Sequence, residues 1–426
     1  MNTPSNSLHD HGDVSGSSAT VVGVSGTARA ARRPQVLMIT DRAPGGDSGY
    51  GMRVDNVING LMKTGDLHVC LIDSSTGGSS LPLAAGYATS VVRAENPSRW
   101  RKLAIAVAGL AQLPYRRKKA LRAEIAAAVG SQAWDFVWFS RVRTYAVAGS
   151  LVTGPRVVDF DDLNDRLACS LIADRTARRG RVRAAPRNLL GVIECHRWRK
   201  LQRRIASEVE CVTVCSDADR QYLGYPNCEV VRNGYRVPEH VLRHPDLEHP
   251  TLLFVGPLSY EPNRLAAEWL AFEVLPRVRR ALPAARLVVV GYNDGASPRL
   301  RHAEGVTLTG FVHDLGPYYA TAAVAATPLQ SGGGTRLKVM EALARSVPLV
   351  STSMGCFGLD LTHDRELLIA DDAEHFAAAC VAIIDRPALA ARLTEAGLAG
   401  FHERLTSDAS GAAVAALATR VAAVSV

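Results

Sequence analysis

The chain has 426 residues, of which 47% are hydrophobic and 21% charged, and it carries a net charge of +8. A chain of this length exceeds one ordinary hydrophobic core, so we expect two domains, and the composition excludes a largely disordered protein. Its eight cysteines lack zinc-like spacing, and we find no secretory signal and no apolar stretch long enough to cross a bilayer. These features predict a cytoplasmic protein with buried, reduced thiols and no metal site.

The first part of the chain predicts one α/β domain after a flexible start. Residues 1–32 are rich in Ser, Gly, Thr and Ala, which is typical of a disordered leader. Short apolar runs then alternate with longer amphipathic segments, which predicts βαβ units around a parallel sheet. We therefore expect an N-terminal Rossmann-like domain over residues 33–243. Its predicted strands are 36–40, 67–73, 136–140, 156–160 and 211–215, with a helix over 50–63.

A second α/β domain follows a linker. Residues 236–251 contain three prolines and no periodicity, and the alternation of strands and helices then restarts. We expect a C-terminal Rossmann-like domain over 244–405, and a C-terminal helix within 406–426 that could cross back to the first domain. The predicted elements are strands 251–256, 286–291, 306–311, 324–328, 348–353 and 366–371, and a helix over 263–282. The fold class is therefore α/β, with two Rossmann-like domains facing a central cleft.

Two glycine-rich turns occupy positions where such sheets bind ligands, after the carboxyl ends of strands. Residues 44–49, PGGDSG, follow the first strand, and Gly45 and Gly46 there would let a phosphate or sugar approach the backbone. An ordinary strand-to-helix turn explains this loop equally well, because it lacks the G-x-G-x-x-G pattern. The turn over residues 332–335 opens a helix, and a helix N-terminus attracts anions.

Charged residues on the helix after the second turn strengthen that interpretation. Arg336 and Lys338 could neutralise a phosphate, and Glu341 could accept hydrogen bonds from ligand hydroxyls. The alternative is a solvated helix face, since Lys338 and Glu341 are three residues apart and Glu341 and Arg345 four apart, which suits ordinary helical ion pairs.

The C-terminal half resembles glycosyltransferase family 4. The resemblance rests on VGPLSYEPNRLAAEWL, LVVVG, GFVHDLGPYY and TPLQSGGGTRLKVMEALARSVPLVSTS, in this order between residues 251 and 386. The N-terminal half is similar more loosely, through PGGDSGYGMRVDNV, VVDFDDLNDR and VRNGYRVP. The resemblance implies a GT-B fold and a retaining transfer of a sugar from a nucleotide-sugar donor, without a metal or other cofactor.

The same resemblance implies roles for individual residues. Glu341 would accept the donor ribose hydroxyls, and Arg336 and Lys338 would neutralise the departing diphosphate. Gly333 stands where many members carry a further glutamate, so the backbone of the glycine turn would hold the transferring sugar. The donor-binding residues implied by the resemblance are Gly45, Gly46, Gly310, Phe311, Gly332, Gly333, Gly334 and Thr335, with the loop at 310–313 lining the nucleobase.

The acceptor side is less defined by sequence. Asp161 and Asp162 follow a predicted strand and are candidates to orient an acceptor hydroxyl, although a helix-capping pair is equally consistent. Basic segments over 99–122 and 175–204 suit either solvated helices or an anionic membrane surface carrying a lipid-linked acceptor. Nucleic acid is the less favoured partner, because no recognised nucleic-acid module is present.

Three functions remain open from sequence. The favoured one is a glycosyltransferase acting on a polysaccharide, glycolipid or natural-product acceptor, which could be a peripheral protein at the inner face of the membrane. By the resemblance, the domain over 33–243 would bind the acceptor and the domain over 244–405 the donor. An epimerase or hydrolase of nucleotide sugars on the same fold would need no acceptor. A non-catalytic basic protein that binds membrane or nucleic acid would have no use for a nucleotide.

Overall fold

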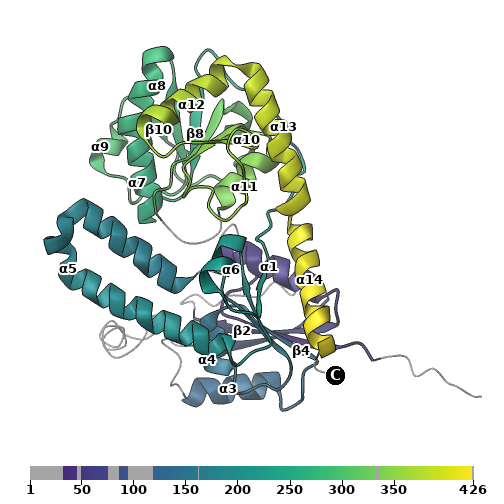
Figure 1. Cartoon of the computed structure of the whole chain (residues 1–426). Coiled ribbons are helices and arrows are strands. Elements are labelled where there is room, and N and C mark those ends of the chain that lie inside the picture. The colour runs from purple at the N-terminus through teal and green to yellow at the C-terminus, as the bar shows by residue number, and fades with distance from the viewer. Residues whose placement is uncertain are drawn as a thin grey trace, which may run out of the picture. The chain divides into compact units, whose positions relative to one another are not determined.

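The computed structural model describes residues 32–45, 49–74, 86–94, 119–161, 163–331 and 336–424, apart from several side chains between 167 and 190. These residues form two parallel sheets, each flanked by helices (Figure 1). The alternation read from sequence therefore leads to two α/β domains, as expected.

The first sheet has seven parallel strands in the order β3-β2-β1-β4-β5-β6-β7. The strands at its centre, β1 and β4, are almost entirely buried, which explains their unbroken apolar sequences. Two strands, β3 and β7, were not predicted, since each is short or partly exposed and lies at an edge. The strands are β1 (Gln35–Thr40), β2 (Asp66–Asp73), β3 (Ala88–Arg93), β4 (Phe136–Phe139), β5 (Arg156–Asp159), β6 (Cys211–Val214) and β7 (Cys228–Val230).

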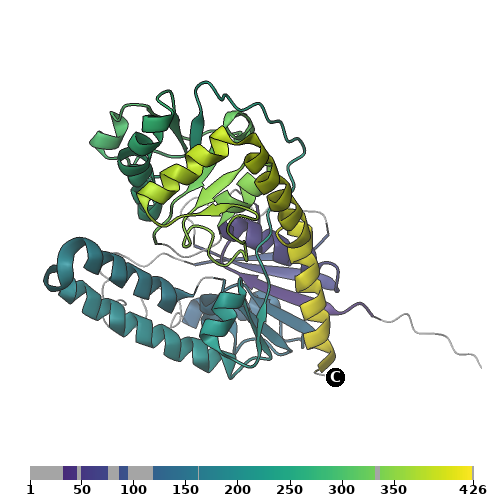
Figure 2. The ribbon, with the colours of Figure 1, turned by 45° about the horizontal axis from the view of Figure 1, so that its top comes forward.

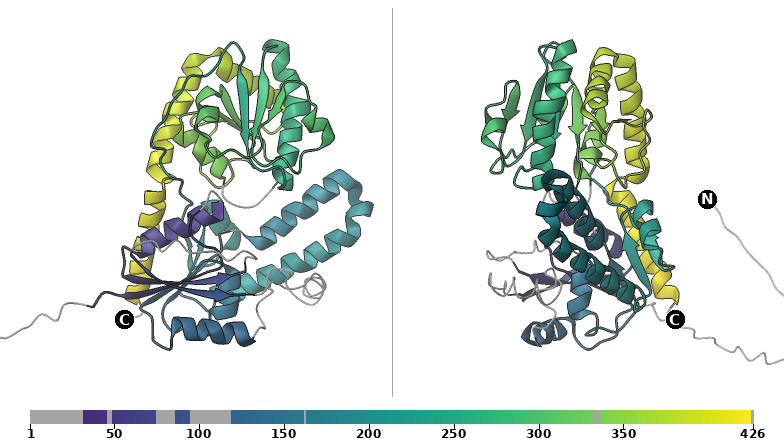
Figure 3. Two further views of the ribbon diagram at one scale, coloured as in Figure 1. Left: turned by 180° about the vertical axis from the view of Figure 1, so that it is seen from behind. Right: turned by 60° about the vertical axis from the view of Figure 1, so that its left-hand side comes forward.

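Five described helices accompany this sheet: α1 (Gly49–Leu61), α3 (Lys119–Val129), α4 (Val142–Ala148), α5 (Asn164–Ala206) and α6 (Asp217–Leu223). The long helical segment α5 doubles back on itself, so its two ends run antiparallel (Figures 1 and 3). We call residues 164–172 its first arm and residues 191–206 its second arm. Contacts between the arms include an ion pair between Arg199 Nε and Asp165 Oδ2 at 3.1 Å.

The second sheet has six parallel strands in the order β10-β9-β8-β11-β12-β13. The strands are β8 (Thr251–Val255), β9 (Arg286–Val290), β10 (Val306–Leu308), β11 (Val324–Thr327), β12 (Leu349–Ser351) and β13 (Leu368–Ile369). The helix predicted over 263–282 is continuous but contains one π turn: α7 (Glu261–Trp269), η1 (Leu270–Val274) and α8 (Leu275–Ala281). The other helices are α9 (Pro298–Arg301), α10 (Gly316–Thr321), α11 (Leu337–Ala344), α12 (Ala373–Asp385) and α13 (Pro387–Arg404).

The last helix, α14 (Ser407–Val424), packs against α1 of the first sheet (Figure 2). Glycines allow the close approach, because a Cβ on Gly60 would lie 2.5 Å from the carbonyl oxygen of Gly411. Leu417 and its neighbours on α14 belong to the same buried apolar cluster as Val57 of α1.

The chain passes between the two sheet regions in segments that contact one another. Residues 236–250 contain no helix or strand. The backbone N–H of Tyr235 donates to the carbonyl of Leu405 at 2.8 Å, and the N–H of Ser407 donates back to the Tyr235 carbonyl at 3.0 Å. The segment that leaves the first sheet is thus bonded directly to the segment that leads into α14.

Candidate functional site

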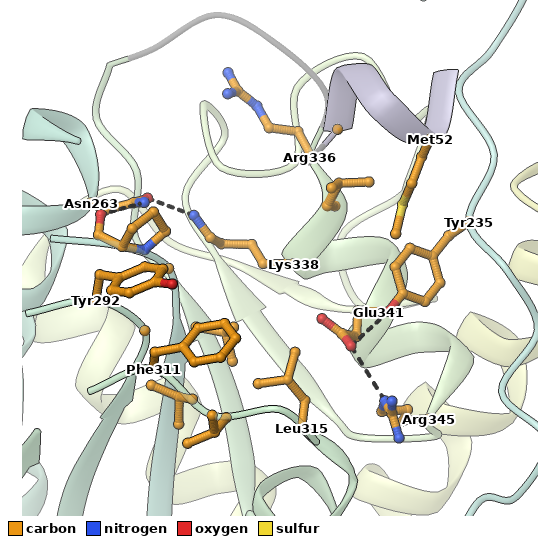
Figure 4. Close-up of a pocket in the computed structure, with 18 of the residues that line it drawn as sticks. Met52, Tyr235, Asn263, Tyr292, Phe311, Leu315, Arg336, Lys338, Glu341 and Arg345 are labelled. Atoms are coloured by element: carbon orange, nitrogen blue, oxygen red, sulfur yellow. Dashed lines mark hydrogen bonds and ion pairs between the residues drawn. The ribbon is translucent and has the colours of Figure 1, made fainter. Parts of the chain in front are cut away.

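A cavity of about 580 Å³ lies at the carboxyl ends of the second sheet's strands (Figure 4). Its walls include Val255 and Gly256 at the end of β8, Val290 and Gly291 at the end of β9, and Leu329 after β11. Ligands of open parallel sheets bind at this edge, and the volume suits a small-molecule ligand.

The carboxylate of Glu341 projects into this cavity from α11 and is held by three neighbours. Tyr235 Oη donates to Oε1 at 2.6 Å, Tyr319 Oη donates to Oε2 at 3.4 Å, and Arg345 Nε lies 3.5 Å from Oε1. Burial raises the pKa of Glu341, whereas these three neighbours each favour the carboxylate. Glu341 is only 6% exposed, so its position is largely fixed before any ligand binds.

Lys338 reaches a different wall of the cavity, one turn earlier on α11. Its Nζ donates to Asn263 Oδ1 at 2.7 Å and lies 5.1 Å from the centre of the Phe254 ring. Burial, and secondarily the positive charge of Arg336, lowers the pKa of Lys338 to about 7. A lysine in this state gains most from an anionic ligand, which would restore its full charge.

Arg336 stands immediately before α11 and also lines the cavity. Its side chain is buried and donates through Nη2 to the sulfur of Met354 at 3.3 Å. A thioether is a weak acceptor, and a guanidinium keeps its positive charge in proteins. Arg336 and Lys338 together make this end of the cavity electropositive.

Two aromatic rings form the wall opposite Glu341 (Figure 4). Tyr292 and Phe311 are stacked, with ring centroids 4.9 Å apart and an interplanar angle of 19°, and the ring of His313 meets Phe311 edge-on. Tyr292 is 52% exposed and Phe311 49% exposed, which is unusual for large rings and leaves them available to a planar ligand group.

The glycines expected to bind a donor are placed unevenly by the structure. Gly310 adopts φ +73°, and its carbonyl accepts the Gly291 N–H at 3.0 Å, which shapes the loop that carries Phe311 into the cavity. Gly45 adopts φ +85°, donates to Asp55 Oδ1 at 2.8 Å and is not among the residues that line the cavity, whereas Gly49 does line it. Gly46, Gly332, Gly333, Gly334 and Thr335 lie outside the described residues.

Asp161 is buried in a network of the first sheet and does not line the cavity. Its Oδ1 lies 3.6 Å from Arg53 Nε and its Oδ2 lies 3.9 Å from an Arg141 nitrogen. Arg53 itself makes two short bonds to Asp159, from Nε at 2.6 Å and from Nη2 at 2.7 Å. Asp162, its predicted companion, lies outside the described residues.

A second polar group of residues gathers at the carboxyl ends of β1 and β4. Tyr50 Oη donates to Asp41 Oδ1 at 2.9 Å, and the guanidinium of Arg141 lies 3.4 Å from the centre of the Tyr50 ring. Arg143 forms an ion pair with Asp41. This edge therefore presents a tyrosine hydroxyl and two guanidinium groups around one carboxylate.

Sequence reasoning identified Glu341, Arg336, Lys338 and Phe311, which the structure brings to one cavity. It did not identify Tyr235 or Tyr292 as site residues. The positions of both tyrosines depend on tertiary contacts between distant segments. The helical ion pair between Glu341 and Arg345 is present, but Lys338 bonds to Asn263 instead of Glu341.

Comparison with known proteins gives a family match for the part of the chain that holds this cavity. Residues 249–386 match the family described as Glycosyl transferases group 1. An uncharacterized 44.6 kDa protein in the cps region of Klebsiella pneumoniae is 27% identical over 172 aligned residues, and the match covers 37% of this chain and 44% of that protein. The match therefore spans less than half the length of this relative.

Solved structures extend the likeness to most of the chain. HepE of Anabaena, in complex with UDP and glucose, has a TM-score of 0.60 at 12% identity, covering 91% of this chain and 99% of that one. Sucrose-phosphate synthase of Thermosynechococcus elongatus has a TM-score of 0.66 at 17% identity, covering 92% and 100%. WaaG, a glycosyltransferase involved in lipopolysaccharide biosynthesis, has a TM-score of 0.56 at 12% identity, covering 89% and 98%.

These likenesses show the GT-B fold, with two parallel-sheet α/β domains, and the match to Glycosyl transferases group 1 covers residues 249–386. Within the described part of the chain, no helix is both long and apolar enough to cross a membrane. The described residues also include no cluster of three histidine, cysteine, aspartate or glutamate side chains suited to a metal ion.

Proposed function

We propose that this chain transfers a sugar from a nucleotide-sugar donor to a glycan or lipid-linked acceptor, with retention of the anomeric configuration, as a cytoplasmic enzyme of the family 4 type. One observation carries the proposal: a single cavity combines exposed stacked rings, a fixed carboxylate and two cations. A nucleotide sugar carries a flat base, a ribose with two hydroxyls and a diphosphate. Each of these three parts has a chemical counterpart in the cavity.

This chemistry assigns each part of the donor to a place in the cavity. The base would stack on Phe311 and Tyr292, and the ribose hydroxyls would donate to the Glu341 carboxylate. Lys338 and Arg336 would bind the diphosphate. By the resemblance, backbone N–H groups of residues 332–335, which lie outside the described residues, would hold the transferring sugar in place of the carboxylate that Gly333 lacks.

The reaction proposed here breaks the bond between the anomeric carbon and the diphosphate oxygen. The acceptor oxygen bonds to that carbon on the same face, and the acceptor proton passes to the departing phosphate. Positive charge from Arg336 and Lys338 stabilises the departing diphosphate, which is the main electrostatic requirement. Since these side chains supply that charge, we propose that the reaction needs no metal and expect an unchanged rate in the presence of a chelator.

The proposal is tested by screening nucleotide sugars against the purified chain. We expect one nucleotide diphosphate to raise thermal stability, by about 2.7 kcal/mol at 100 times its dissociation constant, and the matching nucleotide sugar to lose its sugar to an added acceptor. Turnover without any acceptor would instead identify an epimerase or hydrolase. If none of the nucleotides raises the thermal stability of the protein, the protein is non-catalytic.

We also propose that the part of α5 from Leu189 to Arg203 brings the enzyme to an anionic membrane surface. Leu189, Val192 and Ile193 are exposed apolar residues at helical spacing, with Leu189 63% exposed. On an α-helix this face continues into Lys200 and Arg203, which are also exposed. Apolar side chains beside cations suit the interface of a bilayer that contains anionic lipids.

Sedimentation with vesicles tests this surface. We expect binding to phosphatidylglycerol vesicles and little to phosphatidylcholine vesicles, with about a 30-fold loss in the double variant Lys200→Ala with Arg203→Ala, at about 1 kcal/mol per cation. The matched control, Lys63→Ala with Arg280→Ala, removes two exposed cations elsewhere and should change binding little. Equal binding to both vesicle types would contradict the proposal.

A further inference from the structure

Two cysteines face each other across the hairpin formed by α5. Cys169 lies on the first arm and Cys195 on the second, and their sulfur atoms are 2.8 Å apart. Both are free thiols. We propose that Cys169 and Cys195 form a reversible disulfide that fastens the two arms of the α5 hairpin when the protein meets a hydroperoxide.

The pairing of these thiols is set by regular packing on both sides of them. One helical turn from the cysteines, on the side away from the bend of the hairpin, Asp165 pairs with Arg199 at 3.1 Å. One helical turn from the cysteines on the other side, toward the bend, Gly191 faces Ile172. A Cβ on Gly191 would lie 3.0 Å from the Ile172 side chain. Three successive contacts therefore keep the arms in one antiparallel register, which holds the two sulfurs at contact distance.

The two thiols differ in access and surroundings. Cys169 is half-buried, and an Arg199 nitrogen lies 3.8 Å from its sulfur. Cys195 is buried, and burial, together with its contact to Cys169, raises its pKa to about 12. A soluble oxidant therefore reacts with Cys169 first. Cys195 stays protonated beside it and can then react with the oxidised sulfur.

The chemistry balances with hydrogen peroxide as the oxidant. The Cys169 sulfur attacks one peroxide oxygen, the O–O bond breaks, and a sulfenic acid and one water form. The Cys195 sulfur then attacks the sulfenic sulfur, its proton leaves with the hydroxyl as a second water, and the S–S bond forms. Two electrons pass from the two thiols to the peroxide, and an external thiol reverses the bond.

The bond would have consequences beyond the hairpin, because it forms next to the point where α5 joins its domain. Asp165 accepts a hydrogen bond from Tyr222 of α6 at 2.6 Å as well as the Arg199 ion pair. Cross-linked arms cannot separate at this point, so the oxidised hairpin would keep a fixed position against α6.

Peptide mass spectrometry of the full-length protein tests this proposal. The reduced protein is treated with a few equivalents of hydrogen peroxide under native conditions, its remaining thiols are alkylated after denaturation, and it is cut with trypsin. We expect a linked pair of the peptides 167–175 and 188–197, lost on reduction, at a level at least about tenfold above any other cysteine pairing. The variant Cys380→Ser, which removes a thiol buried in the second sheet region, should retain the link, and Cys169→Ser should lose it.

Mixed samples of ¹⁴N- and ¹⁵N-labelled protein separate a link within one chain from a link between copies. Only single-isotope linked pairs are expected, and mixed-isotope pairs would overturn the proposal. Accumulation of sulfinic acid on Cys169 without any link to Cys195 would overturn it as well. Both readouts come from the wild-type chain, so they stand even where a variant fails to fold.

Discussion

Lys338 gives the proposed donor site a distinctive dependence on pH. Its pKa is lowered to about 7 by burial and by the charge of Arg336. Only the charged amine attracts a diphosphate strongly, so in the unliganded protein the binding-competent form is lost as pH rises through 7. A bound diphosphate should raise this pKa again, so that binding above pH 7 is coupled to the uptake of a proton.

The size of this effect follows from the charged fraction of the amine. With a pKa of about 7, roughly nine-tenths of Lys338 is charged at pH 6 but only about 3% at pH 8.5. If only the charged form binds, affinity for a nucleotide sugar falls by about 30-fold over this range, which is about 2 kcal/mol. At pH 8 each bound ligand should take up close to one proton.

Calorimetric titration in buffers of different ionisation enthalpy measures this uptake directly. A nucleotide sugar such as UDP-glucose is the preferred probe, because its diphosphate has no group that titrates between pH 6 and pH 9. Uptake at pH 8 should disappear in Lys338→Met and remain in Lys63→Met, which removes an exposed amine. His313 also lines the cavity, so His313→Gln serves as a second control that should retain the uptake. Zero uptake in the wild type, or full uptake in Lys338→Met, would refute the reasoning.

Further predictions concern the carboxylate and the buried charges. Glu341→Ala should weaken nucleotide binding by about 100-fold, because two charge-assisted hydrogen bonds to the ribose are lost. A wild-type affinity in calorimetry would mean that the ribose does not bind at Glu341. Tyr235→Phe removes the 2.6 Å bond to Glu341 and should lower the free energy of unfolding by about 1–3 kcal/mol in urea denaturation, and no change would mean that this bond is replaced. Arg53→Met leaves the buried Asp159 without its ion-pair partner and should lower the free energy of unfolding by about 3–5 kcal/mol. Arg204→Met, at an exposed ion pair, should lower it by less than about 1 kcal/mol. Similar losses in the two variants would contradict this reasoning.

The sequence predicted the fold well where strands are buried on both faces. The apolar run at 36–40 corresponds to β1, and the one at 251–256 to β8, because strands in the middle of a parallel sheet need uninterrupted apolar residues. Strand β3 has the sequence ATSVVR, and much of it is exposed, so its pattern resembles that of a loop. Its assignment as a strand depends on pairing with β2, which is a tertiary contact.

The candidate site was predictable to the extent that it lies on one helix. Arg336, Lys338 and Glu341 are close in sequence, and α11 presents all three to the cavity. Tyr235 reaches Glu341 from a segment 106 residues away, and Tyr292 meets Phe311 only because the ends of β9 and β10 are neighbours in the sheet. Local periodicity contains no information about such pairs, since they are fixed by strand order and by the path of the chain between the domains.

The arrangement of charge within the cavity also limits how a donor could lie in it. The aromatic wall at Phe311 and the carboxylate of Glu341 suit the uncharged nucleoside, whereas Lys338 and Arg336 repel a cation and attract a diphosphate. A donor placed in the reverse direction would set its diphosphate against Glu341, and the like charges would destabilise it. Under the proposed function only one direction is therefore favourable, and the anomeric carbon points past Lys338. Gly49 of α1 lines the same cavity, so the acceptor would enter from the side of the first sheet.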